Sequence, residues 1–387
     1  MLSVSTGYDV AYLTGPVAGG REGYYTGAVV DAGEPPGLWY GAGAETLGLT
    51  GEVDAELIEA VYSHLLDPRD PATHTRATWG EAEALATAHR EYRSADEVYA
   101  TLLEADPDAG PEQRAELRAQ AERSARQAVS FLDVTFSAPK SVTVLGVAFE
   151  YMANQARAAG DLEAAQAWSA HHQAVEDAVL AGSRAAIDYL QDQAGYSRIG
   201  HHGGGAGRWI DAHQFVVAQF LQHDSRNRDP QLHVHGAILN RVLCTDGQWR
   251  TLDSQAIKTF RPAAAAVGER VAEAYITQVL GVRFATRPDG KAREILGVPQ
   301  TVMDLFSSRS HQIGPKAQQL LAEYRDRVGR EPSALERYRI AQRATLATRA
   351  AKSHQGEDPQ QRLDRWEAET RAELAGGLAQ VADTVLG

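Results

Sequence analysis

The hydrophobic positions change their period along the chain and divide it into helical and extended stretches. Residues 147–193 have the composition and spacing of two helices that are separated at Gly160-Asp161. Residues 196–253 carry short apolar and β-branched runs instead, which are typical of strands. The runs predict strands over 196–199, 209–222, 234–243 and 249–252, with a hairpin turn at 245–247.

The flanking segments complete an α+β pattern. Residues 131–145 predict a strand, a turn at Ser-Ala-Pro and a further element, and the Gly- and Tyr-rich residues 1–50 predict loops with short helical pieces. Helices are predicted over 53–66, in two solvent-facing pieces of 80–128, over 254–281 and from 302 onward, with a small hairpin in 282–300. We therefore expect a central antiparallel sheet with helices packed on it.

Composition places the chain among soluble globular proteins. Its 387 residues are 43% hydrophobic and 23% charged, and no apolar run approaches the roughly 20 residues that span a bilayer. The first residues lack the basic and apolar regions of a secretory signal. The single cysteine, Cys244, excludes an internal disulfide and fits a reducing cytoplasm.

The net charge of −13 argues against nucleic acid as a partner, but the charge is unevenly distributed. Acidic residues outnumber basic ones in 81–126, whereas basic residues outnumber acidic ones in 196–261, where six histidines also lie. A locally basic cleft on an acidic protein is compatible with this distribution.

The candidate chemistry begins with three histidines, His223, His233 and His235. His233 and His235 are two apart before an apolar run, so on a strand their side chains point the same way. With His223 they would form a metal site of three imidazoles that leaves room for a substrate oxygen, with His213 as the alternative third ligand. The competing interpretation is ordinary surface or core histidines.

Two further groups can cooperate with such a metal. Asp133 on its strand could orient a ligand histidine or accept a proton, or it could merely cap the following turn. The tyrosines near the start of the chain, Tyr12, Tyr24 and Tyr25, carry hydroxyls that become nucleophiles when the electrophile is activated, although most tyrosines only pack. A metal that polarises a phosphate oxygen would supply that activation, which points to phosphoryl transfer.

At this point the residues resemble a known family. Residues 133–141 follow the motif Asp-x-Thr-Phe-Ser-Ala-Pro-Lys-Ser, and residues 223–235 contain Asp-Pro-Gln-Leu-His-x-His, both of which are similar to motifs of MobF-class conjugative relaxases. This family, of the TrwC/TraI type, belongs to the His-hydrophobic-His (HUH) endonucleases. Further similar segments, in the same order, lie at 37–49, 246–252 and 305–310.

The resemblance implies roles for the candidate residues. His223, His233 and His235 would bind a divalent metal, Mg²⁺ or Mn²⁺ in use and Zn²⁺, Ni²⁺ or Co²⁺ as possible occupants, and Asp133 would orient a ligand or act as base. The nucleophile would be a tyrosine, Tyr12 first and then Tyr24 or Tyr25, with Tyr8 as an outside candidate. Tyr12 stands alone where family members often carry a pair.

The resemblance also implies a domain plan and partners. Residues 1–320 would form the relaxase domain with a helical insertion at about 81–126, and 321–387 would lead as helices toward a further C-terminal region. The expected partners are single-stranded DNA at a transfer origin, a helicase region or separate helicase, accessory nicking proteins and a type IV secretion coupling protein, in a bacterial cytoplasm without membrane insertion.

Cations and aromatic side chains near the histidines are the candidates for DNA contacts. Each phosphate of a single strand that a cation neutralises adds about 0.7 to the logarithmic salt dependence of binding, and exposed tryptophans can stack on bases. Trp209, next to an apolar strand, is expected to pack in the core instead. The candidates are Lys140, Arg198, Arg208, Arg226, Arg228, Arg241, Arg250, Lys258, Trp39 and Trp249.

Three other functions compete with a relaxase. A rolling-circle replication initiator of the HUH class usually places its tyrosine after the histidines, whereas here the tyrosines come first. A metal-dependent phosphodiesterase that activates water would need the histidines but no tyrosine. A non-catalytic DNA-binding module would tolerate the loss of both Asp133 and the metal.

Overall fold

The structure is a computed structural model of the whole chain. It describes residues 1–10, 35–107, 109–200, 205, 207–290, 292–348 and 357–386. The predicted nucleophiles Tyr12, Tyr24 and Tyr25 lie outside the described residues.

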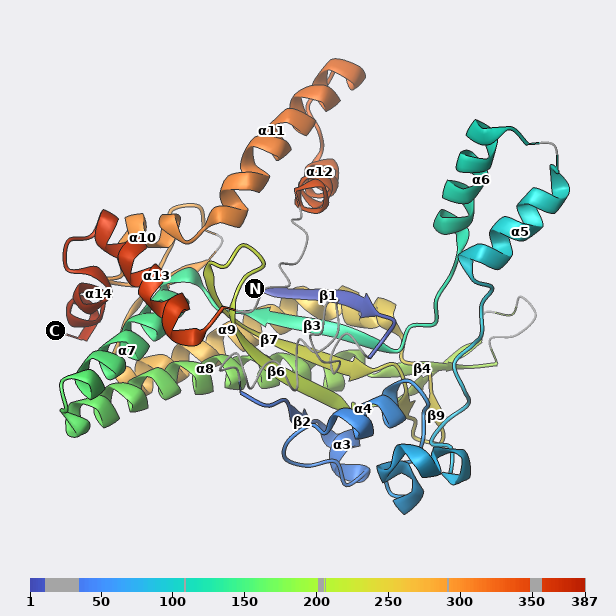
Figure 1. Cartoon of the computed structure of the whole chain (residues 1–387), viewed down its shortest axis with the longest axis horizontal. Helices are drawn as coiled ribbons and strands as arrows, with labels where there is room; N and C mark the ends of the chain where they lie inside the picture. Colours follow the sequence, from blue (N-terminus) through green and yellow to red (C-terminus); the bar gives the residue numbers. More distant parts are fainter. Residues whose placement is uncertain are drawn as a thin grey trace.

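A five-stranded antiparallel sheet forms the centre of the molecule (Figure 1). The strand order is β1-β3-β7-β6-β2, so that the two longest strands, β7 and β6, pair next to β3 in the interior of the sheet. The strands span Leu2–Gly7 (β1), Phe131–Ser137 (β3), Pro230–Leu239 (β7), Val217–Asp224 (β6) and Leu38–Tyr40 (β2).

Three long helices cover one face of this sheet. They are α7 (Lys140–Ala158), α8 (Leu162–Ala194) and α9 (Ser254–Leu280). Asp161 and Asp253 cap α8 and α9 by accepting backbone N–H groups, which satisfies donors that a helix N-terminus leaves unpaired. Leu132, Val134 and Phe136 of β3 point toward these helices and belong to the main hydrophobic core.

Among the described residues, short helices cover one end of the opposite face of the sheet. Helix α4 (Ala55–Tyr62) packs there beside α3 (Ala42–Thr46), and its Tyr62 donates a hydrogen bond of 2.8 Å to the carbonyl of Ala237. Ile58, Phe131 and Phe220 share this second core with Tyr62. The helical cover therefore lies over the end of β7 that follows the histidines.

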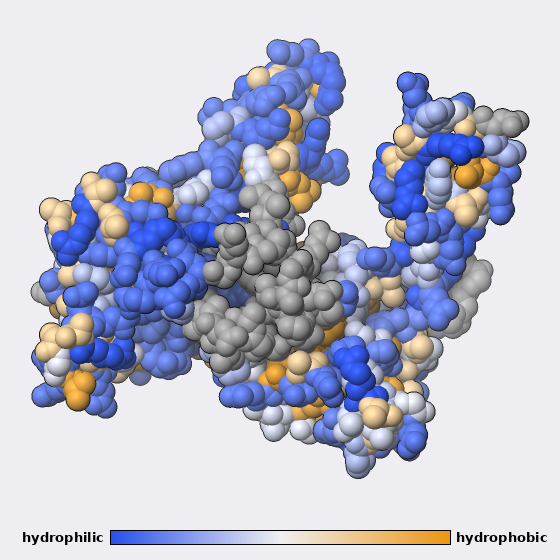
Figure 2. All heavy atoms as spheres, in the orientation of Figure 1, coloured by the Kyte–Doolittle hydropathy of each residue, from blue (hydrophilic) through white to orange (hydrophobic). Residues whose placement is uncertain are grey.

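The remaining elements surround this frame. Helices α5 and α6 project from one end, as do α11 and α12 near the other, and hydrophilic residues predominate on both projections (Figure 2). The bounds are η1 Pro71–His74, η2 Arg76–Glu81, α5 Ala95–Ala105, α6 Pro111–Ser124, β4 Tyr196–Ile199, β5 Arg208–Asp211, β8 Val242–Leu243, β9 Trp249–Arg250, β10 Phe284–Thr286, β11 Arg293–Ile295, α10 Gln300–Leu305, α11 Ser308–Val328, α12 Ala334–Ala347, α13 Pro359–Glu373 and α14 Gly377–Leu386.

Several sequence predictions need correction in detail. Within the described part of the first fifty residues, the predicted short helical piece is present as α3, but two strands that were not predicted, β1 and β2, also form the edges of the central sheet. The single strand predicted over 209–222 is divided between β5, in a separate ribbon, and β6, because the chain leaves the extended conformation in between. The α+β class, the antiparallel sheet and the helical break at 160–161 are confirmed.

The C-terminal helices belong to the same body as the sheet. The predicted domain boundary at residue 320 falls inside α11, and Leu363 and Trp366 of α13 and Leu378 of α14 are buried in the main core. None of the described helices is both long and apolar enough to cross a membrane.

Helices α8 and α9 cross at two glycines. A Cβ atom on Gly268 would lie 2.5 Å from the carbonyl oxygen of Gly182, and one on Gly182 would lie 2.8 Å from that of Gly268. Phe136 of β3 closes the space beneath, 2.9 Å from the same Gly268 position. The absence of side chains therefore lets α9 approach α8, and through it the sheet.

We expect Gly268→Ala to destabilise the fold, because neither backbone can move away without disturbing Phe136. Overpacking of this kind costs about 1–3 kcal/mol, and denaturant unfolding measures it. Gly329→Ala is the comparison at a helix end. Since Gly329 has a φ of 72°, Gly329→Ala should lower the free energy of unfolding through backbone strain, without a change in the α8–α9 contact. An unchanged midpoint for Gly268→Ala would contradict the close approach.

Candidate active site

The structure brings Asp133, His233 and His235 together on the face of the sheet away from α8. Strand β3 pairs with β7 so that Thr135 lies opposite His235 and Ser137 opposite His233. Directly opposed residues share a face, and that face is the one away from α8. The two imidazole rings lie 5.0 Å apart, centre to centre, nearly edge to face at 67°.

Hydrogen bonds fix the tautomer of both histidines. Nδ1 of His235 lies 2.9 and 3.0 Å from the two carboxylate oxygens of Asp133, and Nδ1 of His233 lies 2.7 Å from the carbonyl oxygen of Gln231. Both partners accept, so each Nδ1 carries a proton and each imidazole is held in one orientation by its partner. This pattern is the one that orients histidines as metal ligands, so the donor set fits a divalent cation.

Asp133 is ionised in this arrangement. Burial by itself would raise its pKa, but the neighbouring His235 and His233 and hydrogen bonds from His235 and Thr135 outweigh burial and hold the pKa below its usual value. Thr135 Oγ1 lies 3.2 Å from the carboxylate and adds to its support. The negative charge on Asp133 in turn increases the electron density that His235 offers a cation.

Lys140 supports the strand that carries the histidines. This lysine was a candidate for a DNA contact, but its ammonium donates to the carbonyl of Pro230 at 2.7 Å and to Oε1 of Gln231 at 3.0 Å, at the start of β7. Because Gln231 also holds His233 through its carbonyl, Lys140 acts on the site through that residue.

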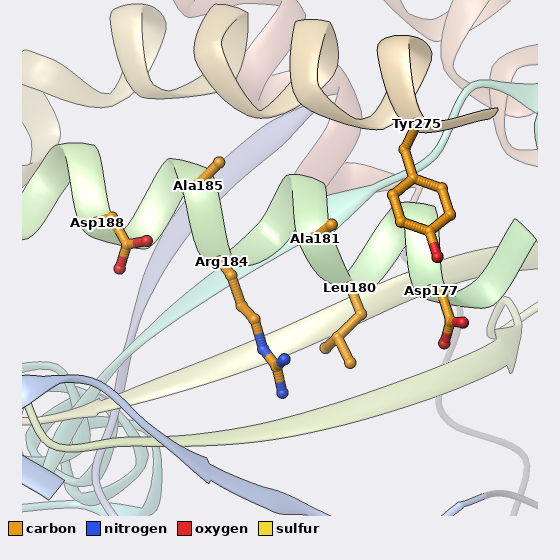
Figure 3. A pocket seen from close by; sticks show the side chains of 7 residues that line it. All are labelled: Asp177, Leu180, Ala181, Arg184, Ala185, Asp188 and Tyr275. Carbon is orange, nitrogen blue, oxygen red and sulfur yellow. The ribbon is translucent and has the colours of Figure 1, made fainter. Parts of the chain in front are cut away.

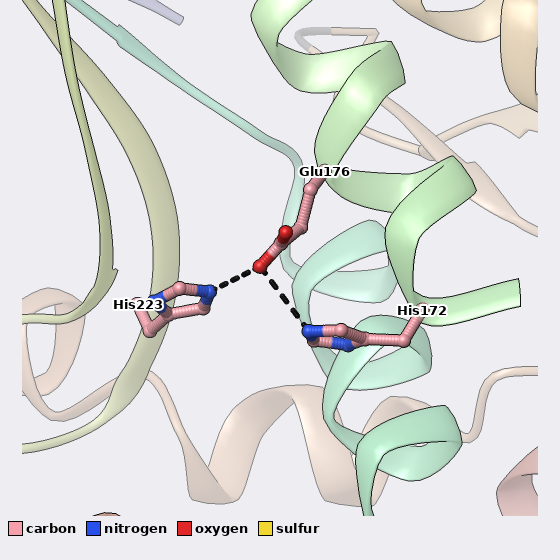
Figure 4. Close-up of side chains that lie close together, drawn as sticks. All are labelled: His172, Glu176 and His223. Atoms are coloured by element: carbon pink, nitrogen blue, oxygen red, sulfur yellow. Dashed lines mark hydrogen bonds and ion pairs between the residues drawn. The ribbon is translucent and has the colours of Figure 1, made fainter. Parts of the chain in front are cut away.

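His223 is placed elsewhere. Its Nε2 lies 2.5 Å from Oε1 of Glu176 on α8, and Nε2 of His172 lies 3.1 Å from the same oxygen (Figure 4). Within the described parts of the chain, these three form the group of possible metal ligands whose atoms lie within 4.8 Å of one another. The predicted cluster of His223 with His233 and His235 is not assembled.

The other predicted site residues in the described part lie away from the His233–His235 pair. Nδ1 of His213, the alternative ligand, donates to the carbonyl of Gln191 at 2.7 Å, on α8. Tyr8 follows the edge strand β1, and its hydroxyl accepts a hydrogen bond of 3.0 Å from Thr6.

Two of the predicted DNA contacts are buried in the protein. The guanidinium of Arg241 donates to the carbonyls of Asn240 and Thr87, and its residue is 7% exposed. Trp39 is likewise 7% exposed and packs in the second core beside Tyr62. Trp249 is partly buried against the same core, and Arg250 next to it is paired with Asp246 at 2.6 Å.

Other candidates are accessible. Trp209 is 53% exposed, so the expectation that it packs in the core was wrong. Arg198 lies 4.2 Å above its ring and Tyr196 meets it edge-on, which makes the β4–β5 ribbon an aromatic and basic surface. Arg208 and Lys258 are exposed, and Arg226 and Arg228 lie partly buried in the loop that joins β6 to β7.

A pocket of about 410 Å³ lies on the other side of the molecule. Six residues of α8, among them Asp177, Arg184 and Asp188, line it with Tyr275 of α9 (Figure 3). One cation between two carboxylates is a poor environment for a DNA phosphate. Arg184 and Asp188 moreover contact Tyr40 of β2, so these groups support the sheet edge.

Sequence reasoning missed the contributions of His172, Glu176 and Gln231. The spacing His-x-x-x-Glu on a predicted helix signals that His172 and Glu176 share a face, because residues four apart are neighbours. Nothing in the spacing reveals that His223 meets them. The carbonyl of Gln231 as a partner of His233 was equally invisible, since a backbone group has no sequence signature.

The sequence profile of the TrwC relaxase family matches residues 6–373. The chain belongs to the TrwC relaxase family. Its relatives include the multifunctional conjugation protein TraI of Escherichia coli, 28% identical over 341 residues that cover 85% of this chain, and TraI of Escherichia coli strain K12 at 27%. The chain spans 14% of the length of these TraI proteins.

Solved structures of TrwC share the fold. The conjugative relaxase TrwC in complex with OriT DNA, metal-free, is 24% identical with a TM-score of 0.56, and the match covers 97% of this chain and 99% of that one. The metal-bound complex has a TM-score of 0.55 with the same coverage, and a copper-bound complex has a TM-score of 0.53 at 23% identity. The fold of TrwC thus matches nearly the whole of this chain.

The environment of Lys140 should make the free energy of unfolding depend on pH in the alkaline range. Burial lowers its pKa to about 8, against the attraction of Asp229 and Glu294. Between that value and its unfolded pKa of about 10.4 the unfolded chain binds more protons, so this residue makes stability rise with pH. We expect the free energy of unfolding of the parent, relative to Lys140→Met, to increase by about 2 kcal/mol from pH 7.5 to pH 10.

The matched control is Lys258→Met, which removes an exposed lysine. Its difference from the parent should stay constant over the same range. Parallel stability curves for Lys140→Met and the parent would show that Lys140 is solvated like an ordinary surface lysine.

Proposed function

We propose that this chain nicks one strand of DNA at a transfer origin and remains attached to the new 5′ end through a tyrosine. The carrying observation is the set Asp133, His235 and His233, in which acceptors hold Nδ1 of both histidines on the face of the sheet away from α8, in a member of the TrwC relaxase family. A structurally similar TrwC relaxase has been solved metal-bound and in complex with OriT DNA, which supports a metal and DNA as the ligands of this chain.

The reaction is a transesterification. The tyrosine hydroxyl loses its proton as its oxygen forms a bond to phosphorus, while the bond from phosphorus to the 3′ oxygen breaks and that oxygen leaves as a hydroxyl after gaining a proton. A divalent cation held by His233 and His235 would neutralise charge on a phosphate oxygen. Since one phosphodiester replaces another, the step is reversible and permits strand transfer.

Asp133 acts in this scheme as a positioning residue. Both of its oxygens lie within 3.0 Å of Nδ1 of His235, and its lowered pKa makes it a weak base. It therefore keeps Nε2 of His235 directed at the cation, and the proton of the nucleophile goes to another acceptor.

The proposal extends to the biological setting. We infer a bacterial cytoplasmic enzyme that acts on single-stranded DNA with Mg²⁺ or Mn²⁺. The TraI relatives are described as multifunctional, and this chain corresponds to a small part of them. Helicase activity, accessory nicking proteins and a secretion coupling protein would therefore be contributed by other regions or chains.

The covalent adduct is the decisive product. With labelled single-stranded DNA from its own transfer origin and Mn²⁺, the parent should give a band that survives SDS and disappears with EDTA. We expect Tyr12→Phe to reduce the adduct by at least about 10²-fold, as expected for loss of a nucleophile, with Tyr24→Phe and Tyr25→Phe affecting a second transfer. Cleaved DNA without an adduct would instead identify a hydrolase that activates water, if the yield of cleavage is unchanged when Tyr12, Tyr24 and Tyr25 are all replaced by Phe.

Asp133→Asn tests the positioning of His235. The amide removes the negative charge behind the imidazole, and loss of such a partner typically costs about 10–100-fold in metal affinity or activity. We expect the rate of adduct formation at limiting Mn²⁺ to fall by that factor and to recover partly at high Mn²⁺. The matched control is Asp188→Asn, a carboxylate on the helix side that binds Tyr40. Equal rates for both variants and the parent would exclude Asp133 from the site.

A further inference from the structure

The loop between β6 and β7 is bonded to the start of α11. Asp229, the last residue before β7, accepts a hydrogen bond of 3.0 Å from the backbone N–H of Ser308 and one of 2.8 Å from its hydroxyl. Ser308 is the first residue of α11, so this carboxylate satisfies a donor that a helix start leaves unpaired. Asn227 of the same loop donates to Gln312, one turn further along α11, at 3.3 Å. Asp229 is only 9% exposed, so water competes little for its two bonds.

The residues on either side of Asp229 contact two other helices. The carbonyl of Arg228 accepts a hydrogen bond of 2.9 Å from Nε1 of Trp366 on α13, and the carbonyl of Pro230 accepts one from Lys140 of α7. Arg228 has a φ of 63°, a conformation that favours glycine and that persists in other residues only where their surroundings fix it. The loop is therefore held by α7, α11 and α13, and the side chain of Asp229 makes the contact with α11.

Helices α11 and α12 form an arm that extends from this loop (Figure 1). Among the described elements they pack mainly on each other, and Arg309 near the start of α11 donates to the carbonyl of Thr348, just past the end of α12, at 2.6 Å. The 21 residues of α11 span about 31 Å. A rotation of about 10° at its first turn would move the tip of the arm by about 5 Å. The direction of the arm thus depends on the contacts of its first turn.

The arm carries arginines whose charges are available to DNA. Arg327, Arg339 and Arg343 are exposed, and none of them is ion-paired with another described residue. Arg339 and Arg343 are four residues apart on α12 and therefore share a face. Asp229 precedes His233 by four residues, which is about 14 Å along an extended chain. The arm therefore begins close to the proposed cleavage site.

We infer that Asp229 is a positioning residue for DNA binding, which fixes the direction of the α11–α12 arm so that Arg339 and Arg343 bind phosphates of the strand that reaches the histidines. This inference rests on the proposed function. The sign of the effect distinguishes it from simple electrostatics. A carboxylate repels phosphates, so its removal by itself would strengthen DNA binding, whereas the loss of a fixed arm weakens it.

The affinity for labelled single-stranded DNA from the transfer origin, measured by fluorescence anisotropy in EDTA, tests this inference without cleavage. We expect Asp229→Ala to raise the Kd at least about fivefold, although it removes a negative charge. Asp161→Ala removes the exposed carboxylate that caps α8. It is the charge-matched control and should leave the Kd within about twofold.

Ser308 provides a milder test of the same contact. Ser308→Ala removes one hydroxyl and leaves Asp229 in place, so it tests the contact even if Asp229→Ala fails to fold. We expect it to raise the Kd by about twofold to fivefold. Ser308→Thr keeps a hydroxyl at this position and should bind DNA like the parent.

The combined variant Arg339→Ala with Arg343→Ala separates positioning from a general loss of structure. It should raise the Kd at least as much as Asp229→Ala, and it should reduce the logarithmic salt dependence of binding by about 1.4, at about 0.7 for each phosphate contact. Because Asp229 acts through these arginines, adding Asp229→Ala to this variant should raise the Kd by no more than about twofold.

The direction of the arm can also be measured directly. Spin labels attached at Glu163→Cys on α8 and Glu323→Cys on α11 report the distance between the body and the arm, and both positions are exposed, whereas the native Cys244 is buried. We expect a narrow distribution of distances in the otherwise unchanged protein and a broad one when Asp229→Ala is added.

Three results would overturn the inference. They are a DNA affinity of Asp229→Ala that equals or exceeds that of the parent, an effect of Asp229→Ala that adds in full to that of the arginine variant, and distance distributions of equal width with and without Asp229→Ala. If one of them occurs while the tyrosine adduct still forms, the proposed function stands and only the role of Asp229 fails. If the adduct does not form while the expected binding changes are observed, the proposed function fails instead.

Discussion

The alternation of side chains across β3, β7 and β6 is the constraint on which the site depends. Because successive residues of a strand point to opposite faces, the register alone decides which polar groups meet. The pairing of Thr135 with His235 and of Gln222 with His233 puts the polar groups on the face away from α8. A slip of one residue would send the histidines into the helices and the apolar side chains of β7 into water.

The two faces of the sheet therefore have different roles. The helix side is closed by apolar packing and by the contact of α8 with α9 at Gly182 and Gly268, which fixes the sheet against a rigid layer. Among the described residues, the helical cover of the other side lies near Ala237, and His233 and His235 lie on a strand that this rigid layer supports from behind. A rigid support of this kind keeps the two Nε2 atoms in place without a large cost of reorganisation when a cation and a phosphate arrive.

Much of this arrangement could be predicted from sequence, for physical reasons that differ between elements. The helices predicted over 147–193 and 254–281 and the hairpin at 245–247 have strong local signals, and the two-residue spacing of His233 and His235 fixes a common face for any strand. Strand β1 was missed because its alternation involves only two apolar residues, Leu2 and Val4, and β2 was missed because three residues are too few to show a period. The place of His223 depends on the register of β6 with β7 and on a carboxylate 47 residues away, and neither is visible in local spacing.

The most direct test is the position of the cation itself. A crystal of the protein soaked with Mn²⁺ should show an anomalous peak between Nε2 of His233 and Nε2 of His235, on the face of the sheet away from α8. A peak between His172, Glu176 and His223, with none beside His233 and His235, would contradict the account.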